Sequence, residues 1–494
     1  MLLKYRRIQY SKSIFLEYKR KDVVKKFMQK HGIMLLIILG ILGLSIGYSA
    51  FNQNLTISGE AKVEKQVVYK EPILNGADPI LQDDLVPVVI EDDGTVRKAR
   101  IYEEWYNYEK QEWANAVILK DEEVTYYSND IIPEENIESY FVWIPRFKYK
   151  IFDEGNYSSL TETENAEQTI EIIFEDRNTL VSNGSKVGEW LTHPAFTSFN
   201  SNGMWVGKFE TGTTLTSDYN VRNGNAVQIK PNVTSWRSIQ LANAFYTSYD
   251  YKRNLDSHMM KNTEWGAVAY LQHSIYGSNK KVRFNNNFDY ITGYSSINEP
   301  TCGYTSPNRD CNRNCNDGSC NSPYNTSIGY LASTTANISG IYDMSGGAWE
   351  YVISFMQSEN GKIIVGQSET STSGFIGIYG QDNLENTVGL SLPNNKYYDL
   401  YPYITKNRAY FHRILGDATG EMGPFASHTY YDYSREVSSW HENRISFINN
   451  TVPIFLRGGS YADGSYSGIF ASNRDTGRLA VNMSFRIVLT PNNA

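Results

Sequence analysis

The chain has 494 residues, of which 41% are hydrophobic and 20% are charged. This ordinary composition excludes a wholly disordered chain, which would lack the apolar residues for a core. The net charge of −8 is unevenly spread, because residues 1–30 carry ten basic and two acidic side chains and leave −16 for the remainder. A basic segment can indicate nucleic-acid binding, but this one ends where an apolar run begins, so we expect no nucleic-acid partner.

The first predicted element is a transmembrane helix over 32–51. Residues 33–51 contain no charged side chain, and this length is enough to cross a bilayer as a helix. The positive-inside rule places the basic tail, 1–31, in the cytoplasm and the bulk of the chain outside the cell. A cleaved signal peptide is the alternative. However, the basic region is longer than that of a typical signal peptide, and Tyr48 stands where the cleavage pattern requires a small residue. The sequence therefore predicts a single-pass cell-membrane protein with the membrane as a partner.

Two short segments follow the predicted helix. Residues 52–66 alternate apolar and polar side chains, which is typical of a strand or a stalk. Residues 67–125 contain two strand-like runs, 86–90 and 95–101, separated by an Asp-Asp-Gly turn, and this pattern predicts a hairpin. The aromatic residues that come next indicate either a small hydrophobic core or a carbohydrate-stacking patch. We therefore predict a small β module over 67–125.

The remainder, 136–494, reads as one long domain of short strands and Gly- and Asn-rich loops. Strand-like runs occur at 141–145, 169–174 and 204–209, and residues 259–271 form the best helical segment. No period of the length used by repeat arrays is visible.

Four motifs in this domain, taken in order, resemble landmarks of the formylglycine-generating (sulfatase-modifying) enzyme family. They are WVGKFE at 205–210, EWGA with a following YL at 264–271, GIYDMSGGAWE at 340–350, and LRGGSY at 456–461 with the closing SFRI at 484–487. The family has a variant of the C-type lectin fold, which the variable ligand-binding proteins of diversity-generating retroelements also use. The resemblance covers roughly 136–490 and implies an α+β, C-type-lectin-like domain, although a fold does not determine a function.

The resemblance also indicates that the family's oxidase chemistry is missing. That chemistry requires two cysteines after the Arg-Gly-Gly-Ser motif, where the thiolates hold copper(I). Asp463 and Gly468 stand at the matching positions, so we expect no copper and favour a non-catalytic protein. The histidines, at 31, 193, 258, 273, 412, 428 and 441, are scattered without metal-type spacing, and each is expected to be a surface or packed residue.

A cysteine cluster lies within the predicted domain. Its members are Cys302, Cys311, Cys315 and Cys320. The surrounding Asn, Asp and Gly residues predict a loop, and an even number of cysteines outside the cell predicts two disulfides of undetermined pairing. A four-thiolate zinc site is the alternative.

A structural calcium ion is implied by the resemblance. Carried over by position, its ligands would be Asp343, Gly346, Ala348 and Glu350, and such oxygen ligands suit a hard cation. The alternative is that Asp343 and Glu350 cap turns and pair with arginine or backbone amides.

These features together predict a membrane-anchored bacterial surface protein whose lectin-like domain serves adhesion or recognition of an extracellular protein or glycan. The predicted contact residues are Tyr461, Asp463, Tyr466, Phe470, Asn473 and Arg474, of which Tyr461 and Phe470 are the first candidates for core residues instead. Two alternatives stay open: an enzyme of the formylglycine-generating type with a divergent active site, and a structural envelope or appendage component.

Overall fold

The structure is a computed structural model, and it describes residues 77–151, 167–184, 188–298, 321–366, 372–376, 378–379, 384–385, 389–403, 414–422 and 439–490. All of these belong to one unit, Tyr69–Asn493. The predicted tail, membrane helix and stalk over 1–66 lie outside the described residues, as do the four cysteines.

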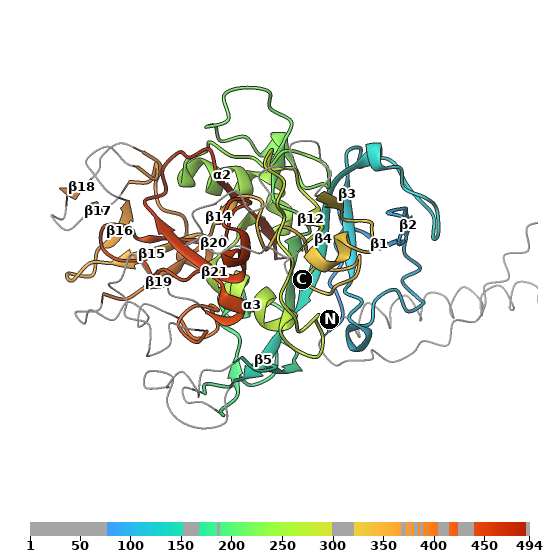
Figure 1. Cartoon of the computed structure of the whole chain (residues 1–494), viewed down its shortest axis with the longest axis horizontal. Helices are drawn as coiled ribbons and strands as arrows, with labels where there is room; N and C mark the ends of the chain where they lie inside the picture. The colour runs from blue at the N-terminus through green and yellow to red at the C-terminus, as the bar shows by residue number, and fades with distance from the viewer. Residues whose placement is uncertain are drawn as a thin grey trace, which may run out of the picture. The chain divides into compact units, whose positions relative to one another are not determined.

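A seven-stranded antiparallel sheet runs through the unit in the order β11-β23-β8-β4-β3-β1-β2, and Figure 1 labels four of its strands, β4, β3, β1 and β2. Its strands are β1 (Val86–Ile90), β2 (Val96–Lys98), β3 (Asn115–Leu119), β4 (Ile137–Pro145), β8 (Gly203–Gly207), β11 (His258–Met259) and β23 (Ile487–Leu489). The predicted hairpin is present as β1 and β2. These strands of the segment 67–125 form one edge of the large sheet, because β3 pairs with both β1 and β4.

A second, four-stranded sheet has the order β21-β20-β14-β22, with β14 and β22 parallel. Its strands are β14 (Trp349–Tyr351), β20 (Ile454–Gly458), β21 (Gly468–Asp475) and β22 (Met483–Phe485). Only Arg486 separates β22 from β23, so the chain passes from the second sheet to the first at this residue. The predicted motifs at 205–210, 340–350, 456–461 and 484–487 therefore converge on this crossing.

The other described sheets have two to five strands. One contains β18 (Leu384–Glu385), β17 (Ile378–Tyr379), β16 (Ile363–Gly366), β15 (Ser354–Gln357) and β19 (Asp399–Tyr401). Another contains β6 (Glu171–Phe174), β5 (Phe147–Lys150) and β7 (Leu191–Thr192). Two-stranded pairs are formed by β9 (Gly212–Thr213) with β10 (Val227–Gln228), and by β12 (Tyr294–Ser296) with β13 (Asn321–Pro323).

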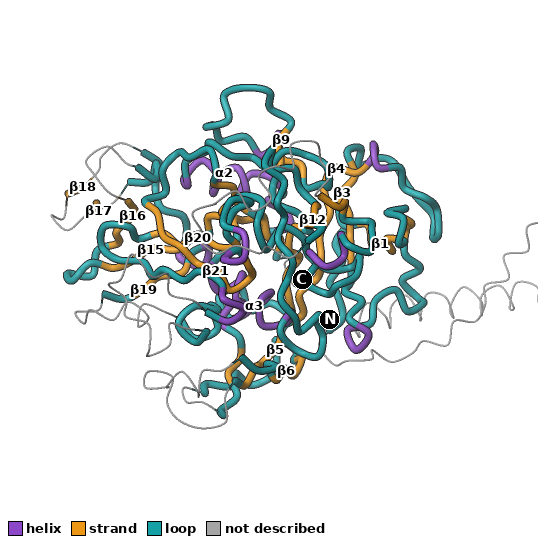
Figure 2. The backbone as a smooth tube through the Cα atoms, viewed as in Figure 1, coloured by secondary structure: helices purple, strands orange, loops and turns teal. Residues whose placement is uncertain are grey.

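Helices are few, and loops make up much of the described chain (Figure 2). Its α-helices are α2 (Leu241–Tyr251) and α3 (Asn262–Gln272), and short 3₁₀ turns lie at Tyr108–Lys110, Glu134–Asn136, Pro194–Phe196, Gly224–Ala226, Arg253–Leu255, Gly329–Ala332, Asn395–Tyr397, Trp440–Glu442 and Gly464–Tyr466. The helix predicted over 259–271 is α3, which begins at Asn262 because Met259 belongs to β11. The Glu264 carboxylate accepts from the Lys261 amide at 2.8 Å and caps its first turn.

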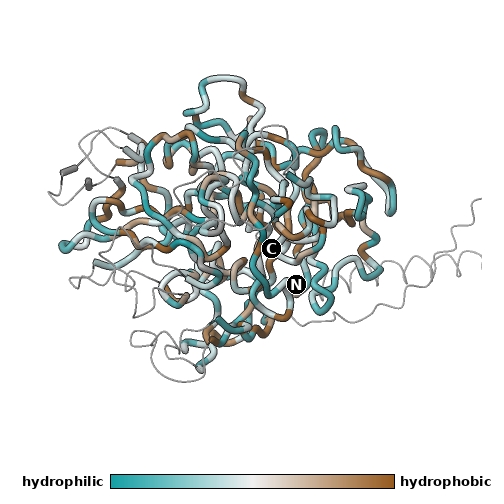
Figure 3. The backbone as a smooth tube through the Cα atoms, in the orientation of Figure 1, coloured by the Kyte–Doolittle hydropathy of each residue, from teal (hydrophilic) through white to brown (hydrophobic). Residues whose placement is uncertain are grey.

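One continuous hydrophobic core contains residues from these helices and from both large sheets. Every residue of α3 is buried, and the Trp265 indole donates to the Ile469 carbonyl oxygen of β21 at 2.7 Å. Hydrophobic stretches along the chain are short and alternate with hydrophilic ones (Figure 3), as expected for many short strands rather than a few long amphipathic helices.

The predicted fold class has to be corrected. The regular secondary structure of the described part is mostly β sheet, with only two α-helices, and none of its helices is long and apolar enough to cross a bilayer. Residues 32–51, for which that helix was predicted, are outside it. The single-pass topology, the cell-membrane localisation and the membrane partner were inferred from that helix and the basic segment before it, and the structure does not support them.

The disulfide prediction has to be corrected in the same way. No disulfide occurs among the described residues. The loop that contains the four cysteines falls within 299–320, which the structure does not describe.

Candidate functional site

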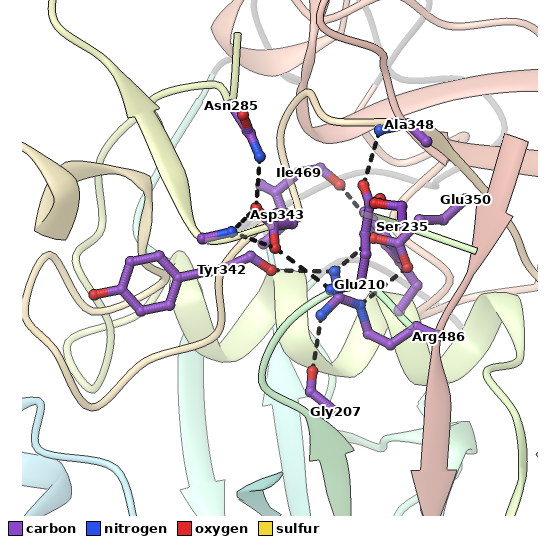
Figure 4. Close-up of polar contacts among 12 residues, drawn as sticks. Gly207, Glu210, Ser235, Asn285, Tyr342, Asp343, Ala348, Glu350, Ile469 and Arg486 are labelled. Atoms are coloured by element: carbon purple, nitrogen blue, oxygen red, sulfur yellow. Dashed lines mark hydrogen bonds and ion pairs between the residues drawn. The ribbon is translucent and has the colours of Figure 1, made fainter. Parts of the chain in front are cut away.

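A buried ion pair occupies the crossing between the two large sheets. Arg486 donates to the two carboxylate oxygens of Glu350, from Nε at 3.0 Å and from Nη2 at 2.5 Å. The same guanidinium donates to the carbonyl oxygens of Gly207 and Tyr342 (Figure 4). Both charged side chains are fully buried. The pair therefore connects β8, β14 and the residue preceding β23 through charge-assisted hydrogen bonds.

Asp343 lies beside this pair and is held by nitrogen donors. Its Oδ1 accepts from the Asn285 side-chain amide at 2.9 Å, and both carboxylate oxygens accept from the Gly293 amide, at 2.9 and 3.0 Å. The Glu210 amide adds a longer contact of 3.4 Å. Asp343 itself has φ of +61°, a left-handed conformation in which a side chain of this kind is tolerated.

Glu210 supplies a third buried carboxylate, which the sequence analysis did not select. It accepts from the Ala348 amide at 2.9 Å and from the Ser235 hydroxyl. Gly347 passes directly over this carboxylate, and a Cβ on residue 347 would contact the Glu210 oxygen. Burial, and then the charges of Glu350 and Asp343, raise the pKa of Glu210 well above its ordinary value. Burial likewise raises the pKa of Asp343 and raises that of Glu350 to about 7.

The residues predicted to bind calcium do not fit that ion in this arrangement. Asp343 uses its oxygens on N–H donors, and Glu350 uses both of its oxygens on the guanidinium of Arg486. A calcium ion needs six to eight oxygen ligands, and a buried guanidinium at the same carboxylate would oppose it. Arg486 thus provides the positive charge here, as in the alternative interpretation in which the carboxylates pair with arginine and amides.

The predicted Arg-Gly-Gly-Ser turn is present at the end of β20. Arg457 donates to the Asn262 side chain at 3.0 Å and to the Asp417 carbonyl oxygen at 2.9 Å. Gly458 and Gly459 have φ of +87° and +82°, a conformation that favours glycine. The motif therefore turns the chain tightly between β20 and the predicted contact segment.

The two positions aligned with the family's cysteines have structural partners of their own. Asp463 accepts from the Ser460 amide at 2.8 Å and from the Ser460 hydroxyl at 2.5 Å. At residue 468 any Cβ would collide with the side-chain amide of Asn443, so this position has no room for a thiol.

The structure separates the six predicted contact residues. Tyr461 is half-buried and packs against Tyr290, whereas Phe470 is fully buried among Trp440, His273 and His441. The other four are half-buried. Asp463 lies 3.9 Å from Arg444, and the carbonyl oxygen of Tyr466 accepts from the Arg444 amide. Arg474 donates to the Phe447 carbonyl oxygen, and Asn473 pairs with Leu456 of the neighbouring strand.

Tyr461 belongs to a surface cluster that the sequence analysis missed. The Tyr461 and Tyr290 rings meet edge to face with centroids 5.0 Å apart, and the Arg237 guanidinium lies 3.8 Å from the Tyr290 ring centroid. Arg237 also donates to the carbonyl oxygen of Val481, whose side chain is 66% exposed. We call Arg237, Tyr290, Tyr461 and Val481 the tyrosine–arginine patch. These residues come from four separated segments, so no local motif could reveal them.

No family model matches the chain, and no curated protein matches it. The family resemblance expected from the four motifs is thus not matched by a family model. Among solved structures, one described as "Major Tropism Determinant I1 Variant" is similar over 85% of this chain and 74% of that chain, at 13% sequence identity and a TM-score of 0.28. At that score the likeness assigns neither a fold nor a function to this chain.

Proposed function

We propose that this chain is a binding protein that recognises a protein surface through the tyrosine–arginine patch. The observation that carries the proposal is the packing of the Arg237 guanidinium and the edge-to-face Tyr461 ring on Tyr290, beside the exposed Val481. Tyrosine and arginine dominate the binding energy of protein interfaces, because they combine large rigid contact areas with polar groups.

The patch rests on a rigid base. The Tyr461 amide donates to the Gly347 carbonyl oxygen at 2.9 Å, and the carbonyl oxygen of Tyr290 accepts from both the amide and the hydroxyl of Ser235. The single proton of that hydroxyl is shared between this carbonyl oxygen and the buried Glu210 carboxylate. Both tyrosines are therefore anchored to residues that contact one carboxylate, which lowers the entropy lost when they meet a partner.

Binding is better supported than oxidase chemistry. Residue 468 has no space for the second thiol of the family's copper pair. A pocket of about 130 Å³ lies instead between Leu119, Tyr126 and Asn136, and none of the predicted contact residues lines it. The patch instead places three partly exposed large side chains, Arg237, Tyr290 and Tyr461, beside the exposed Val481.

The test is a selection of phage-displayed random peptides on the immobilised full-length chain, with Tyr461→Ser and Tyr127→Ser variants in parallel. Tyr127 is a matched control, because its side chain is 71% exposed and lies outside the patch. We expect enriched peptides to bind wild type and Tyr127→Ser alike and Tyr461→Ser at least about tenfold more weakly. The proposal would be contradicted if the enriched peptides bind all three proteins alike. It would also be contradicted if the chain binds only to the glycans of a glycan array.

A further inference from the structure

Three residues far apart in the sequence meet beside α3. Glu167 precedes β6, His273 directly follows α3, and His441 lies in the 3₁₀ turn Trp440–Glu442. One carboxylate oxygen of Glu167 is 3.2 Å from His441 Nδ1, and the other is 3.7 Å from His273 Nε2. One ligand atom from each residue lies within 4.8 Å of the other two.

The two separations that involve Glu167, 3.2 and 3.7 Å, are close to those between the ligand atoms of a small divalent ion. A tetrahedral zinc ion with bonds of roughly 2.0–2.2 Å holds its ligand atoms about 3.3–3.6 Å apart. Two imidazoles and one carboxylate are also an established ligand set for first-row transition ions, and they leave coordination positions open.

The histidines are held ready for such an ion. The rings of Trp440 and Phe470 pack on His273, with centroid distances of 5.1 and 5.5 Å, and Phe470 also packs on His441. Burial lowers the pKa of His273 to about 4, and burial, then His273 and Lys281, lower that of His441 to about 3. Both rings are therefore neutral near pH 7 and offer a lone pair, which metal ligation requires.

Each histidine ring has one nitrogen that the protein leaves without a hydrogen-bond partner. His273 Nε2 and His441 Nδ1 face Glu167 and would be the ligand atoms, while the opposite nitrogens, His273 Nδ1 and His441 Nε2, are buried without a hydrogen-bond partner. His441 also has φ of +60°, an uncommon backbone conformation for a residue with a side chain. The Glu167 side chain is 44% exposed, so an ion has an entry path from solvent.

We propose that Glu167, His273 and His441 bind one divalent transition-metal ion, for which zinc is the best match. The ion would fasten the end of α3 to the segments that carry Glu167 and His441. Since Phe470 contacts both histidines and lies in β21, metal binding would also stabilise the strand that carries three of the predicted contact residues.

The experiment is calorimetric titration of the metal-free full-length chain with zinc chloride, together with thermal melting with zinc and with a chelator. Glu167→Gln and His441→Ala remove ligands, and Glu171→Gln is the matched control, since Glu171 is an exposed carboxylate on neighbouring β6 that pairs with Lys150. We expect one zinc site per chain, at least about tenfold weaker in both ligand variants and unchanged in the control. Zinc should also raise the melting temperature of the wild type and the control only.

The same variants distinguish zinc at the proposed site from zinc bound by the cysteines. It would persist in Glu167→Gln and His441→Ala, so the zinc lost in those variants reports the proposed site alone. Cobalt(II) provides an independent readout, because coordination by nitrogen and oxygen lacks the thiolate charge-transfer absorption that cysteine ligands produce. The proposal is overturned if zinc does not bind, or if its affinity is the same in the ligand variants as in the wild type.

Discussion

The ring of Tyr461 meets the ring of Tyr290 edge to face, with 5.0 Å between their centroids. Burial, followed by the neighbouring Tyr461, raises the pKa of Tyr290 to about 12, so its hydroxyl stays protonated at neutral pH. An edge-to-face pair is stabilised by about 0.5–1.5 kcal/mol beyond the area it buries. The two rings therefore hold one another in place, and Tyr461 is the predicted contact residue with the strongest structural case.

Glu350→Gln should strongly destabilise the protein. It leaves the buried Arg486 guanidinium without its carboxylate, which costs about 3–5 kcal/mol for a buried pair. Unfolding in urea, followed by circular dichroism, measures the free-energy change. Glu103→Gln is the control, because its pair with Arg100 is solvent-exposed and should change the free energy by less than about 1 kcal/mol. Similar small losses in both variants would mean that Arg486 does not depend on Glu350.

Part of the arrangement around Arg486 could be predicted from the sequence. The order of the motifs and the helix over 259–271 follow from local pattern, and α3 matches that prediction to within a few residues. The nature of the charge beside Glu350 could not be predicted, because a carboxylate that binds calcium and one that binds a distant arginine have the same local sequence. Only the adjacent pairing of β14 with β22 brings Arg486 to it.

Long-range contacts also explain what the sequence analysis missed. Tyr290 and Arg237 have no motif of their own and become part of a site only when their loops meet Tyr461. The histidines showed no metal-type spacing because Glu167, His273 and His441 belong to three separate segments. Phe470 was predicted as a contact residue, but it lies in the wholly buried part of β21, and its ring packs against His273 at the end of α3 and against Trp440.

Asp399 should make stability depend on pH. Burial raises its pKa to about 6, against the opposing charge of Lys261, and its carboxylate accepts from the amide and hydroxyl of Thr263 at the start of α3. Since the folded state binds this proton more tightly than the unfolded state, its stabilising contribution is full below about pH 4 and is lost as the pH rises through 6.

Asp399→Asn removes this titration. The free energy of unfolding of the wild type relative to the variant should fall by about 2–3 kcal/mol between pH 4 and pH 6. Urea denaturation of both proteins across this range measures the difference, in which the other titrating groups cancel. A difference that stays constant with pH would show that Asp399 does not bind the proton.

Gly468→Ala should destabilise the protein by about 1–3 kcal/mol, because the new methyl group collides with the Asn443 side chain. Asn443 cannot move freely, since it donates to the Ser467 carbonyl oxygen at 3.0 Å and accepts from the Phe470 amide at 3.2 Å. A double-mutant cycle with Asn443→Ala checks the cause by thermal denaturation. The double variant should lose less stability than the sum of the losses in the two single variants. A loss equal to that sum would mean that the new methyl group collides with something other than Asn443.

Recognition through the tyrosine–arginine patch is tested most directly by calorimetric titration of the strongest selected peptide into four full-length proteins: wild type, Tyr290→Ser, Tyr461→Ser and Tyr127→Ser. We predict that both patch variants raise the dissociation constant by about thirtyfold, equivalent to about 2 kcal/mol, while Tyr127→Ser leaves it unchanged. Equal affinity for all four proteins would contradict the account, because it would place the binding surface away from Tyr290 and Tyr461.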